Sequence, residues 1–412
     1  MSVRSRVGAL AERNFRLIFS SATVSALGDG VSTIALAFAV LHISGSPTAL
    51  GAVIAARQVA SAAITVAAGV WADRLPRHLV LVAAATVQGT VQVTSGTLVI
   101  TGDATVPLLA GLAVAYGLAE GFVIPAEQGL IPLIVSSARL QQANALMGLS
   151  RSILRVAGPA VGGVLVVLGS PGGGLIVDGV TFAVAALLLV RLSIPPRADA
   201  AAPERFLVEL REGWNEFRRQ TWIWTTIVFF GIGNFAGASL FVLGPLVAKR
   251  DLGGPGAWAT IVSAGGLGSI VGGVVALRFR PKRPLLASCV AAVPYGFQTL
   301  ALGLGLPLWA LVANSALAGG ALAVHLALWF TVFQQQVPEA ARSRVSSYDA
   351  LGSFVLIPLG SALAGPVSVL IGVSATLIAS GLISLACIAV VIAQPSVWAI
   401  ESAKPGPAPA AA

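Results

Sequence analysis

The segment 69–78 reads GVWADRLPRH, and it joins two long apolar runs, residues 49–71 and 79–101. Each run is long enough for a membrane-spanning helix, which needs about 20 mostly apolar residues. The segment between them places Asp73 and Arg74 where the first run ends. Charged groups are costly inside hydrocarbon, so they belong at the ends of such helices. This part of the chain is therefore predicted to form two membrane spans joined by a short charged turn.

The rest of the chain has the same character. Of its 412 residues, 56% are hydrophobic and 10% are charged, and the mean hydropathy is +0.90. Soluble domains carry about 25% charged residues, and disordered chains are far less apolar, so both classes are excluded. Long apolar runs without period-2 alternation favour helices over a β-barrel. We predict an all-α polytopic membrane protein with twelve transmembrane helices, at residues 15–40, 49–71, 79–101, 107–131, 144–169, 173–192, 222–247, 256–277, 285–305, 308–333, 346–370 and 372–394.

The positions of the basic residues predict the orientation of these spans. Lys and Arg gather in the cytoplasmic loops of membrane proteins. With the N-terminus in the cytoplasm, most of the 25 Lys and Arg residues fall on the cytoplasmic side, and only Lys249 and Arg250 fall outside. One span more or fewer in the middle of the chain would destroy this asymmetry. Both termini are therefore expected to be cytoplasmic.

The longest polar segment divides the chain into two parts. Residues 193–221 open with prolines and continue with apolar side chains at helical spacing, which predicts a cytoplasmic linker with an amphipathic helix on the membrane surface. A solvated linker with some helical content is the alternative. The predicted organisation is a six-helix bundle at 1–192, the linker, a second six-helix bundle at 222–395 and a disordered cytoplasmic tail at 396–412.

The two bundles echo each other in sequence. Residues 69–74 close the second span, and residues 273–278 close the eighth with the same Gly, Val, Ala and Arg, but with Leu277 in place of Asp73. Two six-span repeats with a long cytoplasmic connector are typical of transporters, in which the substrate path lies between the repeats.

Three groups of residues carry a family resemblance. The segment 69–78 resembles the major facilitator superfamily signature Gly-x-x-x-Asp-Arg-x-x-Arg-(Arg/Lys), with matches at Gly69, Asp73, Arg74 and Arg77. The fifth span resembles the Gly-Pro-x-x-Gly-Gly element of superfamily exporters, through Arg151, Arg155, Gly158, Pro159, Gly162 and Gly163. Residues 27–30 and 140–146 are similar to the bacterial subgroup that contains the enterobactin exporter and macrolide efflux proteins.

The resemblance implies a fold, a place in the cell and an energy source. It implies two pseudo-symmetric six-helix halves in the bacterial plasma (inner) membrane that transport by alternating access. It implies a small-molecule substrate, the proton motive force instead of a cofactor, and a monomer in the lipid bilayer without nucleic acid. Asp73 can accept hydrogen bonds from a neighbouring helix N-terminus, which suits a gate. The alternative is that Arg74 and Arg77 only set the topology.

Charged residues within spans are the candidate functional residues, because they must pair or face a cavity. Asp29 lies near the middle of the first span and Glu120 near the middle of the fourth, and the resemblance places both spans around the substrate. A carboxyl group there can exchange protons at physiological pH or hold a cationic substrate. The alternative for Asp29 is a hydrogen bond between packed helices. His325 in the tenth span is a candidate proton carrier, and the alternative is a simply packed side chain.

Ion pairs are expected among the remaining charges within the spans. Glu127 lies at a depth similar to that of Arg151 and Arg155, so we expect it to pair with one of them. Arg57 is expected to reach the outer boundary or to pair with Asp178. At the start of the eleventh span, an acid is expected to pair with a nearby arginine, Asp349 with Arg342 or Arg344.

Three functions remain open. No Ser/His/Asp order, metal-ligand spacing or phosphate-binding loop is present, so neither an enzyme nor a metal site is predicted. The leading interpretation is a proton-coupled exporter of small, fairly apolar molecules such as antibiotics or siderophores. The first alternative is an importer of a small nutrient or metabolite on the same fold, and the second is a membrane receptor or assembly subunit without transport. The acids within the spans argue against the second alternative.

Overall fold

A computed structural model describes residues 8–71, 76–136, 139–193 and 218–401 of the chain. Within these ranges it contains helices and no strands, and twelve of the helical segments are long and apolar enough to cross a membrane. The predicted fold class and number of spans are therefore confirmed. The predicted linker helix lies outside the described residues.

The first six spans are single helices after a short 3-10 turn (η1, Gly8–Ala11). They are α2 (Arg13–Ser44), α3 (Pro47–Trp71), α4 (Arg77–Thr101), α5 (Val106–Ile134), α6 (Leu140–Leu168) and α7 (Pro171–Leu189). Local sequence explains their ends. Gly45 follows α2 at φ 61°, a left-handed conformation that favours glycine, and its N–H donates to the Leu41 carbonyl. Ser170 caps α7 by accepting the Gly173 N–H.

Three of the last six spans are each divided into two helices. These spans are α9 (Thr221–Gly237) with α10 (Ser239–Asp251), α11 (Pro255–Arg278), α12 (Pro284–Ala291) with α13 (Val293–Gly303), α14 (Leu308–Gln336), α15 (Glu339–Phe354) with α16 (Ile357–Ile371), and α17 (Val373–Ile392). The residue ranges predicted for these spans did not indicate the divisions. Pro294 and Pro358 lie in the first turns of α13 and α16, where proline lacks the N–H that would continue the preceding helix.

The chain ends in an ordered turn where a disordered tail was predicted. Helix α18 (Pro395–Trp398) follows α17, and Val397 and Ile400 are buried in the core of the second bundle. The predicted disordered segment, 396–412, therefore begins too early, because two apolar side chains within it have a core to enter. Residues 402–412 lie outside the described ranges.

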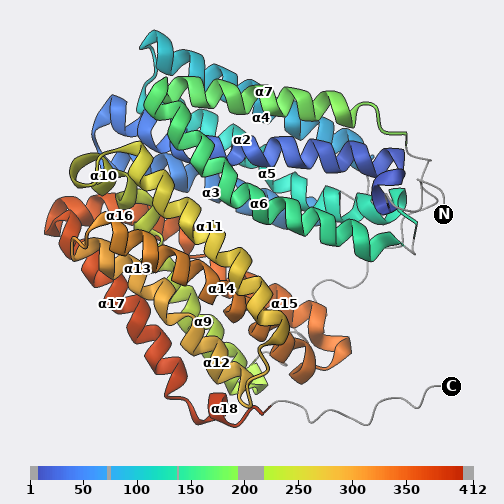
Figure 1. Ribbon diagram of the computed structural model, residues 1–412, viewed down its shortest axis with the longest axis vertical. Coiled ribbons are helices and arrows are strands. Elements are labelled where there is room, and N and C mark those ends of the chain that lie inside the picture. The colour runs from blue at the N-terminus through green and yellow to red at the C-terminus, as the bar shows by residue number, and fades with distance from the viewer. Residues whose placement is uncertain (1–7, 72–75, 137–138, 194–217, 402–412) are drawn as a thin grey trace.

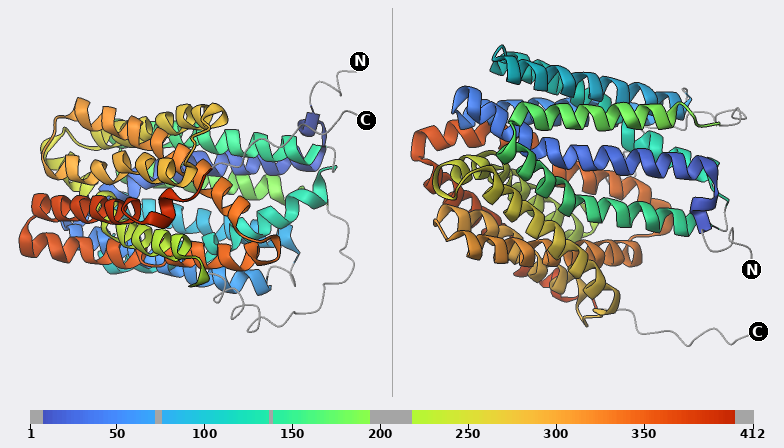
Figure 2. Two further views of the ribbon diagram at one scale, coloured as in Figure 1. Left: turned by 90° about the horizontal axis from the view of Figure 1, so that it is seen from below. Right: turned by 45° about the horizontal axis from the view of Figure 1, so that its top comes forward.

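The helices form two bundles with related packing (Figure 1). In the first bundle α2 packs on α6 and α7, and α3 packs on α5; in the second bundle α9 packs on α17, and α11 packs on α14. The bundles meet through α3 with α16 and through α6 with α11. Two further views show the same pair of bundles side by side (Figure 2). This arrangement has the pseudo-symmetry that the sequence echo predicts.

The two ends of the molecule differ. We call the end at which α2 begins the basic end, because the Arg residues Arg13, Arg16, Arg139, Arg191 and Arg278 lie at helix termini there, and we call the opposite end the outer end. At the outer end one apolar core includes buried residues of both bundles. Toward the basic end each bundle has its own core, and the bundles are farther apart (Figure 1). The molecule is therefore closed at the outer end.

Apolar side chains also cover the outward faces of the helices. Leu168, Leu277 and Leu370 are more than two-thirds exposed, and many other large apolar residues are exposed on the same spans. Apolar surface on this scale is not stable in water. It fits the hydrocarbon of a bilayer, as expected of a multi-pass membrane protein.

Candidate functional site

A cavity of about 860 Å³ lies between the two bundles. Along α2 it extends from Leu36 to Ile18, which corresponds to about 27 Å of helix at ~1.5 Å per residue. The first bundle supplies nearly all of its polar lining. The second bundle supplies apolar and aromatic side chains, namely Phe241, Pro245, Trp258, Phe354, Ile357 and Pro358. A molecule in this cavity would touch a charged wall on one side and an apolar wall on the other.

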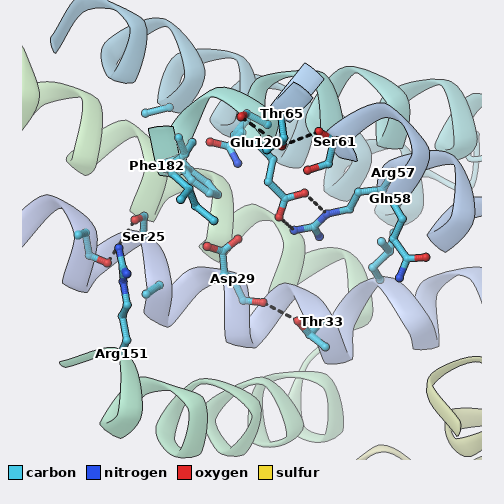
Figure 3. Close-up of a pocket in the computed structure, with 18 of the residues that line it drawn as sticks. Ser25, Asp29, Thr33, Arg57, Gln58, Ser61, Thr65, Glu120, Arg151 and Phe182 are labelled. Atoms are coloured by element: carbon cyan, nitrogen blue, oxygen red, sulfur yellow. Dashed lines mark hydrogen bonds and ion pairs between the residues drawn. The ribbon is translucent and has the colours of Figure 1, made fainter. Parts of the chain in front are cut away.

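Asp29 lies in the charged wall, at the middle of α2. Its carboxylate points from α2 toward Arg57 and Glu120 (Figure 3). The Tyr116 hydroxyl donates to Asp29 Oδ1 at 2.5 Å. The backbone carbonyl of Asp29 is occupied as well, since Ser32 and Thr33 donate to it. Asp29 therefore lines the cavity, and its role in transport stays a prediction.

Arg57 from α3 forms a two-point ion pair with Glu120 from α5. Its Nη2 donates to Oε1 at 2.8 Å and its Nε donates to Oε2 at 3.1 Å. The expected pairing of Arg57 with Asp178 was wrong, because Arg57 turns into the cavity instead of toward the outer boundary. Asp29 and Glu120 are thus two carboxylates beside one guanidinium, and with both ionised this cluster carries one excess negative charge.

Close helix packing holds Arg57 in place. Gly117 and Gly121 of α5 lie against the backbone carbonyls of Arg57 and Ser61, and a Cβ at Gly121 would lie 2.7 Å from the Ser61 oxygen. Two glycines four residues apart let helix backbones approach closely in a membrane. The Gly-x-x-x-Gly spacing in α5 was not used in the prediction, although the sequence contains it.

Asp178 of α7 packs against Gly28 of α2, outside the cavity lining, and is fully buried. It accepts hydrogen bonds from Gln92 Nε2 at 2.5 Å and from Thr181 Oγ1 at 3.3 Å. A Cβ at Gly28 would collide with the side chains of Asp178 and Thr181. The sequence analysis considered Asp178 only as a partner for Arg57. Its place inside the sixth span already indicated that it needs hydrogen-bond donors from neighbouring helices.

The expected ion pair of Glu127 is present nearer the basic end. Arg151 Nη2 donates to Glu127 Oε2 at 2.5 Å. Arg155 does not take part, because its Nη2 donates to Ser152 Oγ. Glu127 and Arg151 both line the cavity. Their ion pair therefore joins α5 to α6 between Asp29 and the basic end.

The glycines of the fifth span make three close helix contacts. A Cβ at Gly158 would lie 2.7 Å from Gly30 Cα, and a Cβ at Gly162 would lie 2.8 Å from Val31 Cα. Gly163 instead faces Ala259 of α11 in the other bundle. Pro159 lies within α6 and is buried beside these glycines. The predicted small-residue face therefore packs α6 both on α2 and on the second bundle.

His325 and Asp349 lie in the second bundle, away from the cavity lining. His325 Nδ1 lies 2.9 Å from Ser288 Oγ, and the ring stacks on Phe230 with centroids 4.8 Å apart. Asp349 accepts from Trp329 Nε1 at 3.1 Å, and from Ser353 Oγ at 3.2 Å. One of its two expected partners, Arg342, donates to the Val337 carbonyl instead. The side chain of the other, Arg344, is not described, so that pairing stays a prediction.

The signature segment is only partly described. Asp73 and Arg74 lie outside the described residues, and Gly69 belongs to α3. Arg77 opens α4, and its guanidinium lies against Gly129 of α5. The gating role expected of these four residues stays a prediction.

The fold and the cavity together define a class of protein: a helical membrane transporter built from two related six-helix halves. The sequence model of the Major Facilitator Superfamily matches residues 18–348, and the chain belongs to this superfamily. It is therefore a transporter and not an enzyme.

Sequence relatives agree with the family. The chain is 27% identical over 370 residues to the enterobactin exporter EntS of Escherichia coli O1:K1 / APEC, covering 84% of this chain and 85% of that protein. It is 22% identical over 248 residues to the MFS-type transporter YvqJ of Bacillus subtilis (strain 168). That match covers 58% of this chain, and the chain spans 59% of YvqJ.

Solved structures agree with the fold. A bacterial homologue of the human lysosomal transporter Spinster, inward-facing and unoccupied, aligns with a TM-score of 0.69 at 16% identity, over 98% of this chain and 99% of that chain. A bacterial homologue of the iron transporter ferroportin, also inward-facing, aligns with a TM-score of 0.69 at 16% identity, over 93% of this chain and 99% of that chain. At these identities the likeness concerns the fold alone.

Proposed function

We propose that the protein is a proton-coupled exporter of small hydrophobic molecules, such as antibiotics or siderophores. In this proposal the basic end faces the cytoplasm, as its Arg residues favour. The cavity is then open toward the cytoplasm and closed toward the outside. Export follows when the two bundles rock about their contacts, so that the outer end opens and the basic end closes.

The observation that carries the proposal is the charge balance in the cavity wall. Glu120 is neutralised by Arg57 through two hydrogen bonds, whereas Asp29 has only the Tyr116 hydroxyl as a side-chain donor among the described residues. A carboxylate in this position is stabilised by a proton or by a positive or donor group of a substrate. Since both need the same carboxylate, they bind in competition, and this competition couples efflux to proton entry.

The substrate class follows from the two walls of the cavity. Phe241, Trp258 and Phe354 offer an apolar surface opposite Asp29, which suits a hydrophobic molecule with one polar group. The match to EntS, whose name describes an enterobactin exporter, supports outward transport. We further propose that the protein works as a monomer in the bacterial inner membrane with both termini cytoplasmic, and that the proton motive force is its energy source.

Accumulation of hydrophobic dyes and antibiotics in cells tests the proposal. Cells that overexpress the protein should accumulate less of at least one compound than cells without it, and Asp29→Asn should abolish the difference. Asp103→Asn is the matched control, because Asp103 is exposed in the turn after α4 at the outer end. It should export normally.

Two results would overturn the proposal. The first is unchanged accumulation of every compound despite normal amounts of protein in the membrane. The second is energy-dependent accumulation that rises with expression, which would identify the importer instead.

A further inference from the structure

Tyr116 contacts both charged parts of the cavity wall. Its hydroxyl donates to Asp29 at 2.5 Å, and the Arg57 guanidinium carbon lies 4.1 Å from the centre of its ring. The residue is 2% exposed, so a ligand in the cavity meets Asp29, Arg57 and Glu120 but hardly meets Tyr116. It connects an acid on α2 to an ion pair between α3 and α5.

The surroundings of Tyr116 allow it little freedom. Phe182 of α7 packs edge-on against its ring, with centroids 5.9 Å apart and the planes at 79°. Glu120 follows Tyr116 by one helical turn, so α5 presents an aromatic ring and a carboxylate on one face. Arg57 lies between these two groups, held by the ring and by the ion pair.

We propose that Tyr116 is a positioning residue of the transport site, which joins Asp29 to the Arg57–Glu120 pair so that the charge on Asp29 governs how firmly Arg57 is held. This inference rests on the proposed exchange at Asp29. A carboxylate that accepts the phenol hydrogen makes the ring more electron-rich, and a more electron-rich ring attracts the guanidinium more strongly. When Asp29 takes up a proton or pairs with a cation, the ring loses this support. The ring then holds Arg57 less firmly, and the two-point pair with Glu120 becomes the main anchor of Arg57.

The exposed fractions of the pair indicate which partner a ligand can reach. The Glu120 side chain is 37% exposed and that of Arg57 is 22% exposed. Arg57 is anchored by the ring and by the close approach of α3 to α5, whereas Glu120 reaches farther into the cavity. A ligand in the cavity therefore reaches Glu120 before Arg57, which is covered by the Tyr116 ring.

Other charged groups near Asp29 are carried by the helices that pack around α2. Besides Arg57 and Glu120, α7 brings Asp178, whose carboxyl group lies against Gly28, the neighbour of Asp29, and α6 brings Arg151, which lines the same cavity. Helix α10 contributes Lys249, which donates to Leu41 at the outer end of α2, about 18 Å farther along the helix. Within the described part of the chain, Asp178, Arg151 and Lys249 form no hydrogen bond with Tyr116, so a change at Tyr116 can be separated from them.

Infrared spectroscopy of the purified full-length protein in lipid tests the first link. The absorbance of protonated carboxyl groups is followed from acid to alkaline pH, and the part that vanishes in Asp29→Asn reports Asp29. In Tyr116→Phe the carboxylate loses its donor, so we expect the midpoint of this signal to move to higher pH by about one unit. Tyr295→Phe makes the same change in the second bundle, away from the cavity, and should leave the midpoint in place. No shift in Tyr116→Phe, or an equal shift in Tyr295→Phe, would overturn the proposal.

A double-mutant comparison tests the second link. Glu120→Gln leaves Arg57 without its counter-charge near Asp29, so the Asp29 midpoint should move to lower pH. In a Tyr116→Leu background the ring is gone, and this displacement should shrink to half or less. In Tyr116→Phe the ring still holds Arg57 but no longer reaches Asp29, so the displacement should be intermediate. An equal displacement in all three backgrounds would show that Tyr116 does not join the two groups.

These titrations need no substrate and no transport. If efflux fails in cells while the titrations behave as expected, the proposed function is wrong and the linkage at Tyr116 stands. If efflux depends on Asp29 while the titrations show no linkage, the reverse holds.

Discussion

Glu127 and Arg151 form an ion pair with very unequal surroundings. The Glu127 side chain is 7% exposed, whereas that of Arg151 is 51% exposed. The second carboxylate oxygen of Glu127 is buried without a hydrogen-bond partner. The buried acid therefore depends on one arginine that reaches it from the cavity, and loss of that arginine leaves a buried charge unpaired.

Arg151→Ala should lower the free energy of unfolding by about 1–3 kcal/mol, less than for a fully buried pair because Arg151 is half exposed. Thermal unfolding of the purified protein in detergent measures this. Arg155→Ala is the matched control, since Arg155 is one turn away and its only hydrogen bond to a described side chain goes to Ser152. Adding Glu127→Leu to Arg151→Ala should recover most of the loss, because no buried carboxylate then remains. Equal effects of the two single arginine changes would contradict this account of the pair.

The sequence predicted how deep each charged residue lies in the membrane, but not which face of its helix the residue occupies. Residue depth follows from counting along a helix, and it correctly matched Glu127 with Arg151. The partner of Arg57 depends on which side of α3 faces the cavity, and counting does not determine that. Tyr116 was overlooked because a tyrosine within a span counts as apolar, and its role arises only from the contacts of its hydroxyl and ring.

At the scale of elements, α2 and α6 touch at their glycines. Gly30 and Gly158 face each other, and a Cβ at Gly30 would lie 2.6 Å from Gly158 Cα. Gly30 is the residue after Asp29, so the distance between α2 and α6 determines the position of the Asp29 carboxylate in the cavity. Close helix approach of this kind needs small residues on both sides.

Gly158→Ala should separate α2 from α6, lower the free energy of unfolding by about 1–3 kcal/mol through overpacking, and reduce efflux. Gly148→Ala is the matched control on the same helix, because a Cβ at Gly148 meets no atom within 4 Å. Glycine within a helix costs stability relative to alanine, so this control should be neutral or stabilising by up to about 1 kcal/mol. Thermal unfolding and the cell assay on both variants test the contact. A Gly158→Ala protein as stable as Gly148→Ala would contradict it.

The elements themselves were largely predictable. Runs of apolar residues and the turns between them fixed twelve spans, since hydropathy directly reflects the cost of exposing polar groups to lipid. The divisions at Ala292 and after Phe354 were missed, although Pro294 and Pro358 were visible. Prolines within spans are often accommodated by neighbouring helices, so the sequence alone did not show which of them divide a span.

At the scale of the whole molecule, the bundles are joined by specific contacts as well as by the apolar core that they share at the outer end. Lys249 of the second bundle donates to the Leu41 carbonyl at the end of α2, at 2.8 Å. Ser361 donates to Gln58 between α16 and α3, and Ser263 donates to the Val156 carbonyl between α11 and α6. Only the contact of Lys249 with Leu41 lies at the outer end among these three, so in the proposed cycle it breaks when that end opens and it stabilises the state described here.

The sequence predicted two halves, but it did not predict that the structure would be closed at the outer end. The echo of residues 69–74 at 273–278 and the linker between the bundles indicate two repeats. Which end is closed depends on the packing of α3 on α16 and of α6 on α11. Both states of an alternating-access protein share one sequence, so pattern alone cannot distinguish them.

The central claim is that Asp29 exchanges a proton for substrate. The most direct measurement is flux of an exported compound, identified in cells, from proteoliposomes with an imposed pH gradient. Wild-type protein and Asp103→Asn should move the compound against its concentration gradient, and collapse of the pH gradient by an ionophore should stop this movement. Asp29→Asn should show no gradient-driven flux. Equal pH-driven flux in Asp29→Asn and wild type, or wild-type flux that ignores the gradient, would contradict the claim.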